Sequence, residues 1–120
     1  MKVLIVDDEP DLCDIISLFL EMKGHQAVIA NCGISGLNTL ETEEVDLILS
    51  DIRMPKCGGI EFLERLKDKI IPHPPFLFMT GFSEVTEEEV VARGAKALLK
   101  KPVSFDDLLK ALEEHGEGSS

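Results

Sequence analysis

Short apolar runs alternate along this chain with longer stretches that have helical spacing. The runs read KVLIV, QAVIA, DLILS, PFLFM and ALL. Their apolar residues are continuous, not alternating with polar ones, which predicts strands of a parallel sheet that is buried on both faces. Because a helical segment lies between successive strands, the pattern predicts a single doubly wound α/β sandwich of five strands and five helices.

The segments between the runs carry signals for helix starts and ends. The first helix is predicted to open at Pro10 and to end at Gly24. Residues 34–41 are predicted as the second helix, although Gly33 and Gly36 lower its helical propensity. Thr86 and Ser104 are predicted to begin the last two helices. The faces predicted to be buried are Leu12, Ile15, Ile16 and Phe19 in the first helix, and Ile60, Leu63, Leu66 and Ile70 in the third.

Length and composition indicate one domain with its own core. The chain has 120 residues, of which 44% are hydrophobic, and this is enough for a single packed interior. We predict that the domain covers residues 1–115. Residues 116–120, GEGSS, have no apolar side chain and are expected to form a disordered tail or a remnant of cloning.

The net charge and the cysteines indicate the cellular compartment of the protein and the classes of partner that it can bind. Twelve Lys and Arg against 23 Asp and Glu give a formal charge of -11, so we expect no direct contact with nucleic acid or membrane. The apolar run at the N-terminus stops at Asp7 and is too short for a signal peptide. Cys13, Cys32 and Cys57 are odd in number and widely spaced, as is typical of reduced thiols. We therefore expect a cytoplasmic protein.

Polar residues follow four of the five predicted strands. Asp7 and Asp8 follow the first, Asp51 the third, Thr80 the fourth and Lys101 the fifth. In an open parallel sheet, ligands bind beyond the carboxyl ends of the strands. With the strand order 2-1-3-4-5, the first and third strands are neighbours, and the three aspartates converge.

Three converging carboxylates repel one another, and a bound cation would relieve this repulsion. A cluster of oxygen donors without nearby Cys or His favours Mg²⁺, with Mn²⁺ as a substitute. A hydroxyl and an ammonium beside such a metal suit a phosphoryl group. Asp51, which stands alone at its strand end, is the best candidate for a nucleophile that forms an acyl phosphate.

Each of these residues also has a structural interpretation. Asp8 could cap a helix, Asp51 could begin a turn with Pro55, Thr80 could be a loop residue, and Lys101 could be a solvated charge beside Lys100. Independent structural causes would have to place all five polar groups at one sheet edge. The functional interpretation is therefore favoured.

The motifs VLIVDDEP, LILSDIRMPKCGGIEFL, FLFMTG and GAKALLKKP occur in this order along the chain. With them the sequence resembles the CheY-like receiver domain of bacterial two-component response regulators over nearly its whole length. The resemblance implies the flavodoxin-like fold, and a phosphoryl group passed from a histidine kinase or histidine phosphotransfer protein to Asp51. A domain of this kind catalyses its own phosphorylation and dephosphorylation but is not a turnover enzyme.

The same resemblance implies roles for the site residues. Asp8 and Asp51 would bind Mg²⁺ directly, Asp7 through water, and Arg53 through its main-chain carbonyl. Lys101 would contact the phosphoryl group, and Thr80 would be the switch residue. The peptide bond between Lys101 and Pro102 would be cis. Phosphorylation would shift the face of the fourth helix, fifth strand and fifth helix, which a downstream output domain or protein, or a second copy in a homodimer, would bind.

Three positions are expected to tune the site. Many receivers have an aromatic residue three positions before the lysine, and here Leu98 stands in its place. Arg53 and Phe82 flank the position where hydrolytic water enters in related proteins. Our hypothesis is that they set the lifetime of the phosphoryl group.

Two rival functions remain at this stage. A phosphatase of the haloacid dehalogenase type also uses an Asp nucleophile and Mg²⁺, but it normally carries a second Asp where this chain has Arg53. An adaptor with a receiver fold that is no longer phosphorylated usually lacks an acidic residue or the lysine, and this chain retains both.

Overall fold

The computed structural model describes residues 1–81 and 85–116. Five parallel strands form one sheet in the order β2-β1-β3-β4-β5, which confirms the predicted topology. The strands are β1 (Lys2–Val6), β2 (Gln26–Ala30), β3 (Leu47–Asp51), β4 (Phe76–Thr80) and β5 (Ala97–Lys100). The helices are α1 (Pro10–Met22), α2 (Gly33–Thr42), α3 (Gly59–Lys69), α4 (Glu87–Ala92) and α5 (Phe105–His115).

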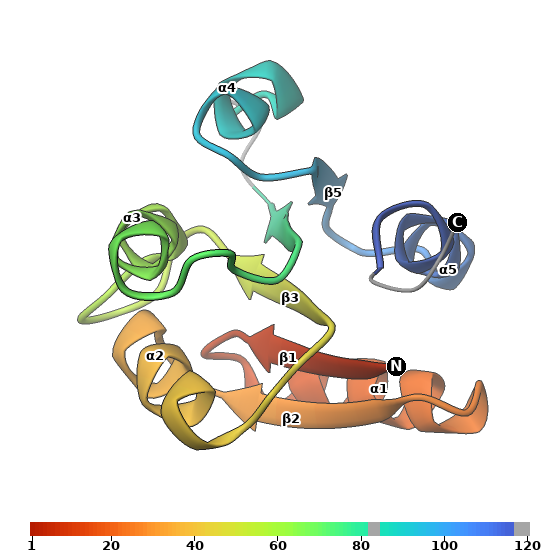
Figure 1. The fold of residues 1–120 in the computed structure, drawn as a ribbon. Coiled ribbons are helices and arrows are strands. Elements are labelled where there is room, and N and C mark those ends of the chain that lie inside the picture. The colour runs from red at the N-terminus through yellow and green to blue at the C-terminus, as the bar shows by residue number, and fades with distance from the viewer. Residues whose placement is uncertain (82–84, 117–120) are drawn as a thin grey trace.

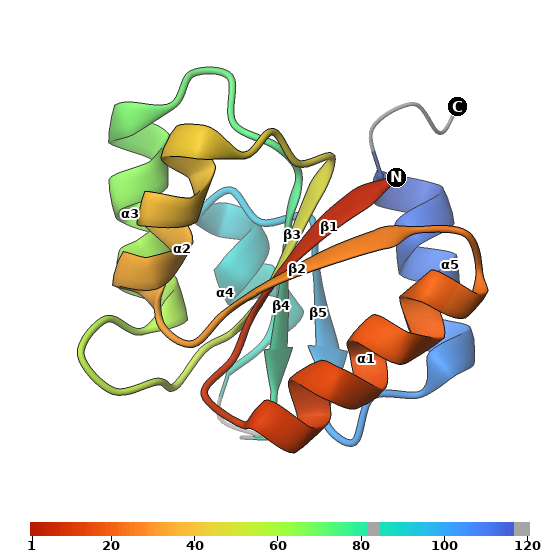
Figure 2. The same cartoon turned by 90° about the horizontal axis from the view of Figure 1, so that it is seen from below.

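Helices cover both faces of the sheet, as Figures 1 and 2 show. Helices α1 and α5 lie on one face, and α2, α3 and α4 lie on the other. Each face has its own buried cluster, because alternate residues of a strand point to opposite sides. Strands β3 and β4, in the middle of the sheet, are buried along their whole length. This explains why their sequences are continuously apolar until the last residues.

The second helix forms in spite of its glycines, and it packs closely because of them. A Cβ atom on Gly36 would lie 2.9 Å from the ring of Phe62 in α3, and one on Gly33 would lie 2.5 Å from Cys57 Sγ. The two glycines therefore lower the helical propensity of α2 but allow it to approach α3 and the segment before it.

The predicted helix starts agree with the structure at all three positions, and α1 begins at Pro10. Thr86 forms a capping box with Glu89, and Ser104 Oγ accepts a hydrogen bond from the main-chain N–H of Asp107. Asp8, which could have capped α1, does not occupy its N-cap position. Glu9 occupies the N-cap position, but its side chain makes no capping hydrogen bond.

One predicted core position is wrong. Ile15 of α1 is 53% exposed, whereas Cys13, Ile16 and Leu20 are buried. The buried stripe therefore runs through residues spaced three and four apart, on a face rotated away from Ile15. In α3, Leu63 and Leu66 are fully buried as predicted, while Ile60 and Ile70 pack at the margin of the core. Phe62 of the same helix is also fully buried.

The cysteines are free thiols, and all three are buried. Within residues 1–81 and 85–116, no helix combines the length and the apolar character that a membrane span requires. Of the predicted tail 116–120, only Gly116 belongs to the described residues.

Candidate functional site

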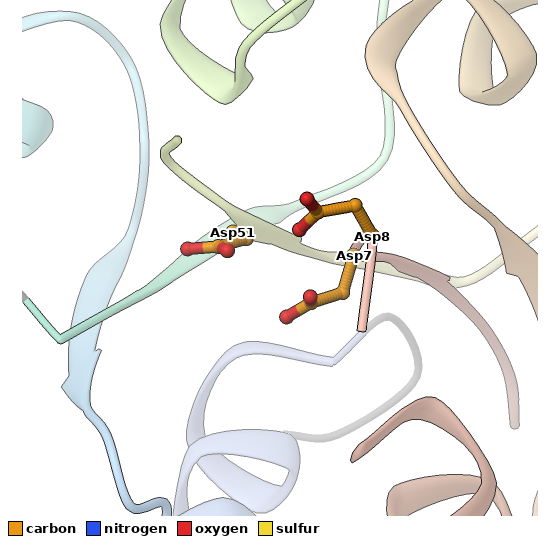
Figure 3. A group of neighbouring side chains, drawn as sticks. All are labelled: Asp7, Asp8 and Asp51. Carbon is orange, nitrogen blue, oxygen red and sulfur yellow. The ribbon is translucent and has the colours of Figure 1, made fainter. Parts of the chain in front are cut away.

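Three aspartates meet at the carboxyl edge of the sheet. Asp7 and Asp8 directly follow β1, and Asp51 is the last residue of β3. Strands β1 and β3 are parallel neighbours with Val6 opposite Ser50, so Asp7 and Asp51 come next to each other. One carboxylate oxygen from each of the three aspartates lies within 4.8 Å of the other two. Figure 3 shows the three side chains gathered at this edge.

The three carboxylates differ in burial and in hydrogen bonding. Asp7 and Asp51 are buried, and Asp8 is exposed. The main-chain N–H of Glu9 donates to Asp7 Oδ1 at 2.9 Å, and that of Ile52 donates to Asp51 Oδ1 at 2.8 Å. Asp7 Oδ2 is fully buried and receives no hydrogen bond from the described residues. Its contact is an ion pair with Lys101.

Lys101 reaches the cluster from the segment after β5. Its Nζ lies 2.9 Å from Asp7 Oδ2, 3.0 Å from Glu9 Oε2 and 3.1 Å from Asp51 Oδ2. The main-chain N–H of Lys101 donates to the carbonyl of Thr80 at 2.8 Å, which holds this segment against the end of β4. The peptide bond between Lys101 and Pro102 is cis, as the family resemblance implied.

The protonation properties follow from this crowding. Burial is the main cause that raises the pKa of Asp51; the ammonium of Lys101 opposes it, and the charge of Asp7 adds to it. Burial alone would lower the pKa of Lys101, but the contacts with Asp7, Glu9 and Asp51 outweigh it and raise this pKa. The lysine therefore remains an ammonium, while a negative charge on Asp51 is only partly compensated.

The donor set fits a hard divalent cation. All three converging side chains offer carboxylate oxygens, the ligands that Mg²⁺ prefers. The buried Asp7 Oδ2 lacks a directed hydrogen bond, and Lys101 is the only cation that forms an ion pair with the cluster among the described residues. The residues present can therefore hold a Mg²⁺ ion, and such an ion would reduce their mutual repulsion.

The structure places Thr80, Arg53 and Leu98, three further predicted residues, at different depths. Thr80 is the last residue of β4 and is fully buried. Arg53 lies two residues beyond Asp51, in the segment between β3 and α3, with an exposed side chain. Leu98 is buried in the core, and its main-chain N–H donates to Glu87 Oε2 of α4 at 3.1 Å. Phe82 lies outside the described residues.

Glu9 is the contact that the sequence analysis missed. No role in the site was predicted for it, whereas its side chain pairs with Lys101, 92 residues further along the chain. The acidic run DDE signals a concentration of charge but does not show which cation each member meets.

The turn between β3 and α3 brings main chain close to Asp51. A Cβ atom on Gly59 would lie 2.1 Å from the carbonyl oxygen of Asp51 and 2.8 Å from the Phe78 ring. Lys56 in the same turn has a positive φ of 69°, a conformation that side chains adopt at some cost. The first residue of α3 and the end of β3 are therefore packed against each other without room for a side chain.

Fold and site together define a class of protein. It is an open α/β domain in which a partly buried lysine lies beside an acidic site of oxygen donors at the carboxyl edge of the sheet. A family model described as the response regulator receiver domain matches residues 3–113. The chain thus belongs to the response regulator receiver domain family.

Curated relatives agree with this assignment. The chain is 38% identical over 115 residues to the transcriptional regulatory protein ZraR of Klebsiella oxytoca, which covers 95% of this chain and 26% of that protein. It is 32% identical over 108 residues to the response regulator SaeR of Staphylococcus epidermidis, covering 89% of this chain and 46% of that one. The chain thus spans about a quarter to a half of the length of these relatives.

Solved structures show the same architecture. A CheY-like receiver domain protein from Methanospirillum hungatei superposes with a TM-score of 0.83 at 34% identity, covering 94% of this chain and 90% of that one. A receiver domain protein from Clostridium thermocellum gives a TM-score of 0.86 at 31% identity, with 95% and 92% covered. These similarities confirm the predicted family and the flavodoxin-like fold.

Proposed function

We propose that this domain accepts a phosphoryl group on Asp51 from a phosphohistidine of a histidine kinase or histidine phosphotransfer protein. The observation that carries the proposal is the meeting of Asp7, Asp8 and Asp51 within 4.8 Å, with Lys101 held against Asp51 and Asp7. Of the three carboxylates, Asp51 is the one that stands on the central strand β3 and contacts the lysine through a hydrogen bond.

The transfer forms one bond and breaks one. A carboxylate oxygen of Asp51 attacks the phosphorus atom, and the bond between phosphorus and the imidazole nitrogen breaks with its electron pair left on nitrogen. The product is an acyl phosphate on Asp51. Lys101 pairs with an oxygen of the transferred group, and Thr80 donates a hydrogen bond to another.

Asp7, Asp8, Asp51 and the main-chain carbonyl of Arg53 would hold Mg²⁺ at this site, and Mn²⁺ would replace it. The bound ion would neutralise negative charge on the oxygens of the transferred phosphoryl group. The domain catalyses its own phosphorylation and dephosphorylation and does not turn over external substrates. Arg53 and Phe82 would limit how readily water reaches the phosphoryl group.

A protein donor is supported by the groove beside the site. A groove of about 870 Å³ is lined by charged residues of the site and by apolar residues of α1 and of the start of α5, among them Leu12, Ile15 and Phe105. Ile15 and Phe105 are 53% and 44% exposed, and together they offer apolar surface within reach of Lys101. Burial of such surface favours a macromolecular partner over a small phosphate ester.

The output surface is proposed to be the face of α4, β5 and α5. Residues of these three elements line a groove of about 530 Å³ that carries both Lys and acidic side chains. Thr80 and Lys101 connect this face to the site, because Lys101 follows β5 directly and its N–H bonds to Thr80. A downstream output domain or a second copy of the chain would bind there, in the cytoplasm and without direct contact to nucleic acid or membrane. Because Leu98 replaces the usual aromatic residue, the coupling would not depend on an aromatic side chain.

The proposal is tested by intact mass after incubation with acetyl phosphate and Mg²⁺. One added phosphoryl group is expected on the wild-type protein, and none on Asp51→Asn or in EDTA. Peptide mapping would place the group on Asp51. No addition with acetyl phosphate or with a phosphorylated histidine phosphotransfer protein would refute the proposal and favour an adaptor role. Sustained release of phosphate from small phosphate esters would instead favour the phosphatase alternative.

A further inference from the structure

The ammonium of Lys101 lies among three carboxylates in the unphosphorylated domain. Its Nζ has carboxylate oxygens of Asp7, Glu9 and Asp51 within 3.1 Å. A lysine ammonium has three N–H donors. The ammonium donates hydrogen bonds to Glu9 Oε2 and Asp51 Oδ2, and Asp7 Oδ2 is its ion-pair partner. A phosphoryl oxygen that contacts Lys101 therefore competes with these three oxygens.

Burial decides which carboxylate can leave. The side chain of Asp7 is 0% exposed and that of Asp51 is 9% exposed, whereas that of Glu9 is 60% exposed. The Oδ1 atoms of Asp7 and Asp51 each also accept a hydrogen bond from a main-chain N–H. Glu9 can rotate into water at little cost, since its carboxylate would stay hydrated there.

The main chain positions Glu9 for this contact. The main-chain N–H of Glu9 donates to Asp7 Oδ1 at 2.9 Å. The main-chain carbonyl of Glu9 accepts a hydrogen bond from the N–H of Cys13 at 3.1 Å. Pro10 follows at the first helical position and restricts the chain further. The side chain makes no helix-capping bond and extends to Lys101 instead.

We propose that Glu9 is a positioning residue that occupies Lys101 in the unphosphorylated domain and must be displaced when a phosphoryl group binds. Its negative charge also opposes the approach of an anionic donor. Glu9 thus lowers the rate of phosphorylation of Asp51 and the affinity of the site for phosphoryl groups. This inference rests on the proposed function, since it concerns the same lysine and the same acceptor.

The test compares Glu9→Gln with wild type and with Asp11→Asn. Asp11 is an exposed residue in the first turn of α1, so its variant removes the same charge at the same helix end. Phosphorylation of Asp51 is followed by intact mass with acetyl phosphate below saturation, at Mg²⁺ levels that saturate each variant. We expect Glu9→Gln to react roughly three- to tenfold faster than wild type, and Asp11→Asn to stay within about twofold.

A second readout separates positioning from a general structural effect. Affinity for beryllofluoride, an analogue of a phosphoryl group on a carboxylate, is measured by NMR titration. Glu9→Gln is expected to bind it tighter by the same factor as the gain in rate. Glu9→Asp keeps the charge but is one methylene too short for the contact with Lys101, so it is expected to lie between wild type and Glu9→Gln. Raising NaCl should reduce the difference between variants, because an exposed carboxylate is screened by salt.

The outcomes distinguish the two proposals. If wild type is phosphorylated on Asp51 but Glu9→Gln matches wild type in rate and in beryllofluoride affinity, the role of Glu9 is refuted and the proposed function stands. An equal gain in Asp11→Asn would also overturn it, since bulk charge would then explain the effect. If wild type takes no phosphoryl group on Asp51, both proposals fail.

Discussion

Replacement of Asp8 by asparagine should have opposite effects on stability without and with Mg²⁺. The carboxylates of Asp7, Asp8 and Asp51 offer oxygens within 4.8 Å of one another. At this separation, two unit charges repel by about 0.9 kcal/mol in bulk water and about 3.5 kcal/mol at an effective dielectric of 20. Because Asp8 is exposed, its two repulsions lie near the lower value and total about 2 kcal/mol.

A second term partly offsets this gain. Asp8 lies just before α1, where a negative charge is stabilised by about 0.3–1 kcal/mol through the helix dipole. The net expectation for Asp8→Asn in EDTA is a stabilisation of about 1 kcal/mol, or roughly 4 °C in Tm. In wild type, Mg²⁺ at ten times its Kd should add about 1.4 kcal/mol of stability. Asp8→Asn should lose most of that addition, because it removes a proposed ligand.

The assay is thermal unfolding of wild type, Asp8→Asn and Asp11→Asn, each in EDTA and in a Mg²⁺ series. Asp11→Asn serves as the matched control, because it removes a charge near the same helix end but outside the cluster. We expect it to lower Tm slightly in EDTA and to leave the Mg²⁺ response intact. If Asp8→Asn lowers Tm in EDTA as the control does, or keeps the full Mg²⁺ response, the reasoning about the cluster is refuted.

Three further predictions concern packing, capping and a buried thiol. Gly59→Ala should destabilise the domain by about 3 kcal/mol in urea unfolding, since its Cβ would lie 2.1 Å from the carbonyl oxygen of Asp51, while Gly81→Ala meets nothing within 4 Å and serves as the comparison. An equal loss in both variants would contradict this steric argument. Thr86→Ala removes the side-chain oxygen that accepts from the main-chain N–H of Glu89 and should cost about 1 kcal/mol by the same assay; an unchanged midpoint would count against the cap. Burial, with help from neighbouring aspartates, raises the pKa of Cys13 from 9.0 to about 11, so the folded state favours the neutral thiol. The contribution of this thiol to the free energy of unfolding should be complete below pH 9 and be lost between pH 9 and about 11. In Cys13→Ala the free energy of unfolding should therefore fall less over that pH range than in wild type.

The elements were predictable because their signals are local. Continuous apolar runs identify buried parallel strands, and Thr86 and Ser104 start α4 and α5 as their sequence context indicates. The meeting of Asp7 and Asp51 followed from topology alone, since neighbouring parallel strands end at the same edge.

Other features depended on how the elements rotate and approach one another. Ile15 was predicted to be buried, but the orientation of α1 on the sheet turns it outward and buries Cys13 and Leu20 instead. Gly33 and Gly36 weaken α2 in isolation, and only the position of Phe62 shows why small residues are needed there. Helical periodicity leaves the rotation of a helix uncertain by about one residue, and packing decides it.

The sequence by itself determined the class of fold, the family resemblance and the set of polar residues at the sheet edge, because spacing and residue type carry that information. The tertiary structure alone decided that Asp7 and Asp51 are buried, that Asp8 is exposed, and that Glu9 meets Lys101 across 92 residues. Such a contact depends on the direction of two long side chains. That direction is set by the segments that the folded sheet brings together, and no local pattern in the chain encodes it.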